Sequence, residues 1–318
     1  MSIASVSPKP QGCAIVTGGN TGLGFACAKQ IASSRKDWQV IIACRNLPKA
    51  HEAVQSLIRQ SGNPNVSAMH LDLASLHSVR LFVEEIQKGE LPPVAAIVCN
   101  AGMSRVDEPL RTADGIEMTF GVNFLGHFLL VNSLISMLPE DAKIALVSSE
   151  LHRENGSMKS FLPRYTTAKE LAFPPKSEEE VPHIASRRYA TSKLCLILYA
   201  RQLAQRLASN GRGITVLAFN PGLMPDTGLG GLNKHAVRRF FLKHILPIFA
   251  RGAVSNPERS GKMLADLVTG LQTTVFSGAY YDQGRQVEPS AMARDTKLQL
   301  DLWQTSLEIT GLDPDFPG

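Results

Sequence analysis

Short apolar segments alternate with helix-like segments along most of this chain, and this alternation restricts the fold more than any other feature. Helix-like segments such as 24–33, 47–60 and 76–88 separate apolar runs that carry no charged side chain. Strands that are apolar throughout are typical of parallel sheets covered on both faces. We expect strands at residues 13–16, 40–44, 66–71, 94–99, 144–147 and 214–219. Such alternation predicts a doubly wound α/β fold with right-handed crossovers.

Two stretches interrupt the alternation. Residues from about 151 to 187 contain Pro174-Pro175 and a run of three glutamates at 178–180. Residues from about 225 to 256 contain several glycines and a basic amphipathic segment at 235–254. Long loops in compact domains are usually functional. We therefore expect one domain over 1–318, with insertions on the substrate side at both places.

Composition excludes several classes of protein. Of the 318 residues, 44% are hydrophobic and 19% charged, which favours a folded core over disorder. Five scattered cysteines without a CxxC pair predict buried reduced thiols, no metal site and a cytoplasmic location. No signal peptide and no run of about 18 uncharged apolar residues is found, so no spanning segment is expected. The net charge of +5 suits an anionic cofactor, but without a basic stripe it predicts no nucleic-acid partner.

The first expected strand runs into the glycine-rich loop TGGNTGLG, residues 17–24, and a helix follows. Glycines remove side chains where a pyrophosphate must approach the backbone, and the helix N-terminus offers free N–H groups to the anion. This context favours a dinucleotide site over a plain turn. The expected cofactor-binding residues in the loop are Gly18, Asn20, Thr21, Gly22, Leu23 and Gly24.

Arg45 follows the second expected strand, where sites for NAD usually place an acidic residue on the ribose hydroxyls. A guanidinium instead offers a fork of donors to a 2′-phosphate. We therefore predict NADP(H) as the cofactor, with a solvated arginine as the alternative.

Polar residues also follow the third and fourth expected strands. Asp72 and Leu73 come after the third strand, and Asn100-Ala101-Gly102 after the fourth. Ligands of open α/β sheets bind at this carboxyl edge, so all five are candidate cofactor contacts. Asp72 has two interpretations, a contact near the adenine and an N-cap for the helix that begins near Ser75.

Four motifs occur in an order that resembles the short-chain dehydrogenase/reductase family. They are TGxxxGxG from Thr17, Asn100-Ala101-Gly102, Ser149, and YxxxK at Tyr189. The resemblance extends from about residue 12 to 311. It implies a single-domain Rossmann fold, with a seven-stranded parallel sheet in the order 3-2-1-4-5-6-7 and helices on both faces. It also implies an NADP-dependent oxidoreductase that is a monomer or homodimer.

Within the family, the sequence looks closest to light-dependent protochlorophyllide reductases and retinol dehydrogenase-like reductases. The stretches 42–46, 69–76 and 122–130 carry this likeness. Leu223, however, stands after Pro221-Gly222 where the photoenzyme has a cysteine. This difference favours a dark reductase of a bulky apolar carbonyl, or oxidation of the corresponding alcohol. The alternatives are protochlorophyllide reductase-like double-bond reduction and a catalytically inactive NADPH-binding regulator.

Two YxxxK matches compete for the catalytic position. Tyr165 is followed by Lys169, but Pro174-Pro175 ends any helix soon after. Tyr189 and Lys193 stand at the start of a long helical pattern, and the four-residue spacing puts them on one helix face. We choose Tyr189 as the general acid and base. A free tyrosine has a pKa of about 10, and we expect the neighbouring ammonium to lower it.

The resemblance assigns the other roles. Lys193 would hold the nicotinamide ribose, and Ser149, rather than its neighbour Ser148, would bind the substrate oxygen. Asn123 would anchor a water that links Lys193 to solvent. Pro221, Gly222, Leu223 and Thr227 would line the nicotinamide.

The amphipathic segment 235–254 alternates apolar residues such as Phe240 and Phe241 with basic ones. It suits a cover over an apolar pocket, a peripheral contact with a membrane surface, or a helix packed on the body of the protein. The sequence leaves these three roles open.

Overall fold

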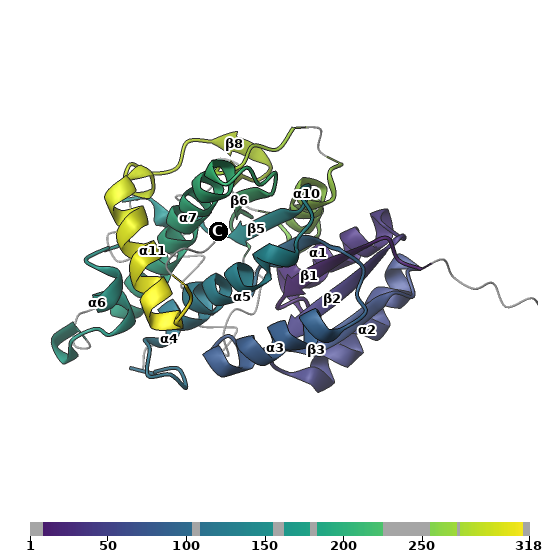
Figure 1. Cartoon of the computed structure of the whole chain (residues 1–318), viewed down its shortest axis with the longest axis horizontal. Helices are drawn as coiled ribbons and strands as arrows, with labels where there is room; N and C mark the ends of the chain where they lie inside the picture. The colour runs from purple at the N-terminus through teal and green to yellow at the C-terminus, as the bar shows by residue number, and fades with distance from the viewer. Residues whose placement is uncertain are drawn as a thin grey trace, which may run out of the picture.

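A single eight-stranded sheet lies at the centre of the protein, in the order β3-β2-β1-β4-β5-β6-β7-β8 (Figure 1). The computed structural model describes residues 9–103, 109–154, 162–178, 183–224, 255–271 and 274–313. The strands are β1 (Gly12–Thr17), β2 (Trp38–Cys44), β3 (Val66–His70), β4 (Val94–Cys99), β5 (Lys143–Val147), β6 (Thr215–Asn220), β7 (Tyr280–Asp282) and β8 (Arg285–Val287). The first seven are parallel and in the expected order, which confirms the doubly wound fold.

The strand count differs from the expected seven because β8 turns back antiparallel to β7. Both strands are only three residues long, and Arg285 and Gln286 of β8 are exposed. Such a short polar edge strand has no apolar pattern that a sequence could reveal. A short polar strand also protects the end of the sheet from pairing with another chain.

Helices cover both faces of the sheet, because alternate strand residues point to opposite sides. On β1, Cys13 and Ile15 belong to one apolar core, whereas Ala14 and Val16 belong to the other. The second core is packed by α1 (Gly22–Ser34), α2 (Leu47–Ser61) and α10 (Pro257–Thr269). The first core is packed by α3 (Leu76–Lys88), α5 (Gly126–Leu134), α7 (Ile184–Ser209) and α11 (Thr296–Thr310). Figure 1 shows α11 alongside α7 on this face.

Short elements complete the chain and place the site residues. They are α4 (Met118–Phe120), the π-helical turn η1 (Gly121–Leu125), η2 (Ile135–Met137), η3 (Glu150–His152), α6 (Ala168–Ala172), η5 (Lys176–Glu178) and η6 (Met292–Arg294). Helix α7 begins at Ile184, five residues before Tyr189, so Tyr189 lies inside the helix rather than at its start. All five cysteines are free and buried, as expected.

One continuous helical run, Met118–Met137, is long and apolar enough to cross a membrane, although the sequence suggested no such segment. Its most apolar 18-residue window is 83% buried inside the fold. Phe124 and Phe128 on this run pack against Tyr199 of α7, and Phe128 also packs against Trp303 of α11. The run is therefore the central helix of the first core.

Candidate active site at the carboxyl edge of the sheet

The glycine-rich loop joins β1 to α1 in a form that leaves the helix N-terminus open. Thr21 precedes α1 in extended conformation, makes no side-chain cap, and no acidic residue lies in the first turn. A Cβ at Gly24 would lie 2.4 Å from the carbonyl oxygen of Gly18, so only glycine lets the helix close against the loop. Bare backbone and unsatisfied N–H groups are what a pyrophosphate needs. The predicted loop residues therefore fit a dinucleotide.

Arg45 lies exposed at the end of β2, close to this loop. The thiol of the preceding residue, Cys44, donates a hydrogen bond to Asn20 Oδ1 in the loop, with an Sγ–Oδ1 distance of 3.4 Å. Asn46 caps α2 by accepting from the Lys49 N–H at 3.0 Å. Within the part of the chain that the structure describes, no hydrogen bond or ion pair engages the Arg45 guanidinium. Its donors are therefore free for an anion beside the loop.

Asp72 is not a helix cap, so that interpretation was wrong. Ser75 caps α3 by accepting from the Ser78 N–H, while Asp72 Oδ1 accepts from the Ala74 N–H at 2.9 Å. The carboxylate thus closes the turn that leads to the helix. Leu73 is buried, and its carbonyl oxygen would lie 2.9 Å from a Cβ at Gly126. The contacts of Asp72 and Leu73 with a cofactor stay predictions.

The Asn100-Ala101-Gly102 segment is fastened to the end of β1 by Thr17. The Thr17 hydroxyl accepts the N–H groups of Asn100 and Ala101, each at 2.9 Å, and Asn100 Nδ2 donates to the Thr17 carbonyl at 2.9 Å. A Cβ on Gly102 would lie 3.1 Å from Asn123 Oδ1 and 3.6 Å from Lys193 Nζ. The segment therefore passes directly over two predicted catalytic residues, where a larger residue would crowd them.

Lys193 is buried on α7 and is held against the end of β5. Its Nζ donates to the Val147 carbonyl at 2.8 Å, and Ser148 Oγ donates to the Lys193 carbonyl at 2.7 Å. Burial lowers the pKa of Lys193 to about 8. The Nζ atom lies 5.6 Å from the centre of the Tyr189 ring. Two hydrogen bonds thus fix the register between strand and helix at this point.

Tyr189 and Ser149 meet beside this lysine. Burial raises the pKa of Tyr189 to about 12, and a hydrogen bond with the Ser149 side chain opposes that rise. Our expectation that Lys193 lowers this pKa was therefore wrong for the structure as it stands. Burial disfavours the phenolate, and the ammonium is directed to the Val147 carbonyl. Ser149 rather than Ser148 acts on the pKa of the phenol, since the Ser148 hydroxyl is donated to the Lys193 carbonyl on α7.

Asn123 lies in the π-helical turn between α4 and α5 and is fully buried. Its Oδ1 accepts from the Met103 N–H at 2.8 Å, and its Nδ2 donates to Ser192 Oγ at 2.9 Å. Ser192 Oγ in turn donates to the Tyr189 carbonyl at 2.7 Å. Asn123 therefore joins the 100–103 segment to α7, which carries Tyr189 and Lys193. Its predicted water contact stays a prediction.

The competing tyrosine, Tyr165, is used in packing. Its hydroxyl donates to Asp301 Oδ2 of α11 at 2.8 Å, and its partner Lys169 is exposed on the short helix α6. Among the described residues, neither side chain is hydrogen-bonded to the end of β5. The structure brings Asn123, Ser149, Tyr189 and Lys193 together and leaves the Tyr165 pair apart.

The described residues after β6, 221–224, follow the strand that pairs with β5. The Gly222 N–H donates to Asn220 Oδ1 at 3.2 Å, and Ser260 Oγ donates to the Pro221 carbonyl at 2.6 Å. The Leu223 carbonyl accepts from the Ser255 N–H at 2.9 Å. Thr227 and the segment 235–254 lie outside the described residues, so their predicted roles stay predictions.

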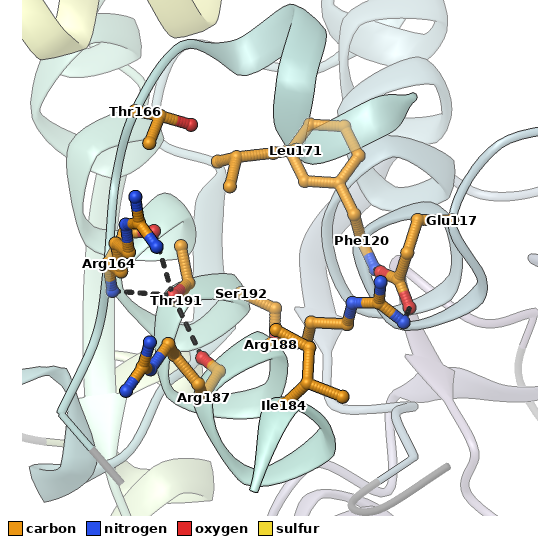
Figure 2. A pocket seen from close by; sticks show the side chains of 10 residues that line it. All are labelled: Glu117, Phe120, Arg164, Thr166, Leu171, Ile184, Arg187, Arg188, Thr191 and Ser192. Carbon is orange, nitrogen blue, oxygen red and sulfur yellow. Dashed lines mark hydrogen bonds and ion pairs between the residues drawn. The ribbon is translucent and has the colours of Figure 1, made fainter. Parts of the chain in front are cut away.

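A small hollow lies between α4, α6 and α7, next to this site (Figure 2). Thr191 Oγ1 accepts from the Arg164 N–H at 2.9 Å and donates to the Arg187 carbonyl at 2.8 Å along one wall. On another wall, Arg188 and Glu117 form an ion pair, with 3.9 Å between Nη1 and Oε1. The volume of the hollow, about 30 Å³, leaves room for only a few water molecules. The hollow is therefore too small for a nicotinamide or a bulky substrate.

His152 is a site residue that sequence reasoning missed. It is fully buried behind Ser149, where its Nδ1 lies 2.8 Å from the Ser149 carbonyl and its Nε2 accepts from the Ser290 N–H at 3.2 Å. Its ring meets the edge of the Tyr280 ring at 4.8 Å between centres. His152 thus ties Ser149, the predicted catalytic serine, to the segment after β8. A lone histidine in a loop gave no sign of this contact.

Comparison with known proteins places this geometry in a family. The sequence pattern of the short chain dehydrogenases matches residues 12–171. Retinol dehydrogenase 13 of Homo sapiens is 34% identical over 94% of this chain and 84% of its own length. The chain belongs to the short-chain dehydrogenase family.

Other similar proteins also match this chain over most of its length. Protochlorophyllide reductase of Avena sativa is 32% identical over 94% of this chain and 99% of its own length. The crystal structure of a blue fluorescent protein from a metagenomic library, in complex with NADPH, superposes with a TM-score of 0.61 at 22% identity. It covers 86% of this chain and 96% of its own chain, and it shows the shared fold. The predicted likeness to protochlorophyllide reductases and to retinol dehydrogenase-like reductases is confirmed.

Burial of His152 predicts that the free energy of unfolding decreases in acid. Burial lowers the pKa of His152 to about 4, whereas an unfolded histidine titrates near 6.5. Its stabilising contribution is therefore complete above pH 6.5 and is lost as the pH falls toward 4, by up to about 3 kcal/mol. Urea unfolding of the wild type and His152→Gln between pH 7 and 4.5 should show a shallower decline in the variant. Parallel declines would contradict the assignment.

Proposed function

We propose that this protein is an NADPH-dependent reductase of a bulky apolar carbonyl compound, or oxidises the corresponding alcohol. The observation that carries the proposal is the meeting of Ser149, Tyr189 and Lys193 at the end of β5. The glycine-rich loop and Arg45 lie along the same edge of the sheet. A bound nicotinamide would supply the hydride.

The residues of the chain would handle the proton. The Ser149 side chain opposes the rise in the Tyr189 pKa, and from this position it can orient a substrate oxygen beside the phenol. With a pKa of about 12, Tyr189 keeps its proton near neutrality and is ready to donate it to that oxygen. Lys193, with a pKa of about 8, is mostly charged at pH 7 and can stabilise the phenolate that remains. With Tyr189 protonated and Lys193 charged before the reaction, the site favours the reductive direction, in which the substrate oxygen takes up a proton.

The substrate class rests on relatives and on the motif pattern. The names of the two relatives refer to retinol and to protochlorophyllide, both bulky and largely apolar molecules. A regulator without activity would be free to lose catalytic side chains, yet Asn123, Ser149, Tyr189 and Lys193 are all present. We therefore favour an enzyme.

Double-bond reduction of the protochlorophyllide type is the second candidate, because the reductase of Avena sativa matches along 99% of its length. Light separates the two activities. NADPH oxidation in darkness with a carbonyl substrate supports our first proposal, and turnover confined to illuminated samples supports the second.

Replacing Tyr189 by Phe should lower kcat by at least about a hundredfold, because general acid catalysis typically contributes that much. NADPH affinity should stay close to that of the wild type. Tyr165→Phe is the matched control, since it removes the hydroxyl of the competing motif, and it should retain normal kcat. If a steady-state assay showed loss of kcat in Tyr165→Phe and normal kcat in Tyr189→Phe, our choice of Tyr189 as the catalytic tyrosine would be wrong.

Replacing Arg45 by Gln should reduce kcat/KM for NADPH by about tenfold or more, through loss of a charge-assisted contact with the 2′-phosphate. The value for NADH, which lacks that phosphate, should change little. Arg259→Gln removes another exposed arginine, on α10, and serves as the control. A wild type that prefers NADH would overturn the cofactor assignment.

A further inference from the structure

His127 lies on α5 between the two halves of the site and is fully buried. On one side its Nε2 lies 2.9 Å from the hydroxyl of Thr17, at the end of β1. On the other side its Nδ1 lies 3.1 Å from the carbonyl oxygen of Asn123. The flat ring thus spans the distance between the cofactor loop and the π-helical turn.

The partners of the ring determine its protonation. A carbonyl oxygen can only accept, so Nδ1 carries the proton that is donated to Asn123. The Thr17 hydroxyl already accepts two N–H groups, from Asn100 and Ala101, so at His127 it acts as the donor. Nε2 at 2.9 Å is a nearer acceptor for its proton than the Val98 carbonyl at 3.4 Å. Burial, the largest cause, lowers the pKa of His127 to about 4, so the ring is neutral as this arrangement requires.

Each end of the ring reaches a different function. Thr17 fixes the Asn100-Ala101 backbone, which lies at the predicted cofactor edge. Asn123 reaches Ser192 and, through it, the backbone of Tyr189. The imidazole of His127 joins these two sets of hydrogen bonds across the first core.

We propose that His127 is a positioning residue that couples dinucleotide binding at the end of β1 to the placement of catalytic Asn123. The proposal rests on the proposed function for its kinetic readout. Its binding readout needs only NADPH.

Two substitutions separate the two ends of the ring. In His127→Asn, the side-chain amide can replace Nδ1 and keep the bond to the Asn123 carbonyl, but it is too short to reach Thr17. In His127→Gln, the longer amide can replace Nε2 and keep Thr17 but loses the bond to Asn123. Loss of one hydrogen bond corresponds to a change of about three- to tenfold.

The expected result is therefore a split. His127→Asn should raise the Kd for NADPH by about three- to tenfold and leave kcat near the wild-type value. His127→Gln should lower kcat by a similar factor and leave the Kd for NADPH unchanged. Fluorescence titration gives the Kd, and steady-state kinetics in saturating NADPH gives kcat.

Asn132→Leu is the matched control for loss of a buried polar side chain. Asn132 lies on the same helix, donates to the Phe128 carbonyl at 2.8 Å and to the Tyr199 hydroxyl at 3.0 Å, and lies outside the site. It should lower stability without changing Kd or kcat. If the two His127 variants changed Kd and kcat alike, or matched Asn132→Leu, the proposal would be overturned.

A measurement on the wild type covers the case in which the variants do not fold. Imidazole ¹⁵N shifts should show the Nδ1–H tautomer for His127, with a change when NADPH saturates the protein. A cationic ring, the opposite tautomer, or shifts that ignore NADPH would overturn the proposal. If the wild type reduced no carbonyl, the proposed function would fail, and the NADPH Kd values and ¹⁵N shifts would still decide the role of His127.

Discussion

The ammonium of Lys193 is a charge in the interior, and its hydrogen bond to the Val147 carbonyl organises the site. Removing a lysine from water is unfavourable unless its donors find partners. Here the Val147 carbonyl accepts one of them at 2.8 Å, while Ser148 ties back to the lysine backbone at 2.7 Å. Because α7 is held at this register, Tyr189, one turn earlier, lies beside Ser149. The burial that makes the lysine costly also keeps the phenol protonated.

A second constraint joins this centre to the cofactor edge. The Thr17 hydroxyl fixes the backbone after β4, and that backbone leads over Gly102 to Asn123 and Lys193. Asn123 accepts from the same segment and donates to Ser192 of α7. The π-helical turn, which often marks functional sites, is where this side chain enters the network. The segment after β4 and helix α7 are therefore parts of one hydrogen-bonded unit.

Sequence reasoning succeeded where a pattern has one physical meaning. Uncharged apolar runs indicated the first six strands to within a few residues, and glycines before a helix indicated the phosphate loop. It failed where the outcome depends on contacts distant in the chain. Nothing near Tyr189 shows that burial would outweigh Lys193 and raise its pKa. The capping role of Ser75 in place of Asp72, the antiparallel β8, and the buried contacts of His127 and His152 all depend on partners brought together by folding.

The most direct measurement of the central claim is a crystal structure of the protein with NADP⁺ bound. The account predicts the pyrophosphate along residues 17–24 and the nicotinamide beside the Tyr189 hydroxyl, with the Lys193 ammonium on the same side. A dinucleotide whose nicotinamide lies away from Tyr189, or that leaves the loop unused, would contradict it.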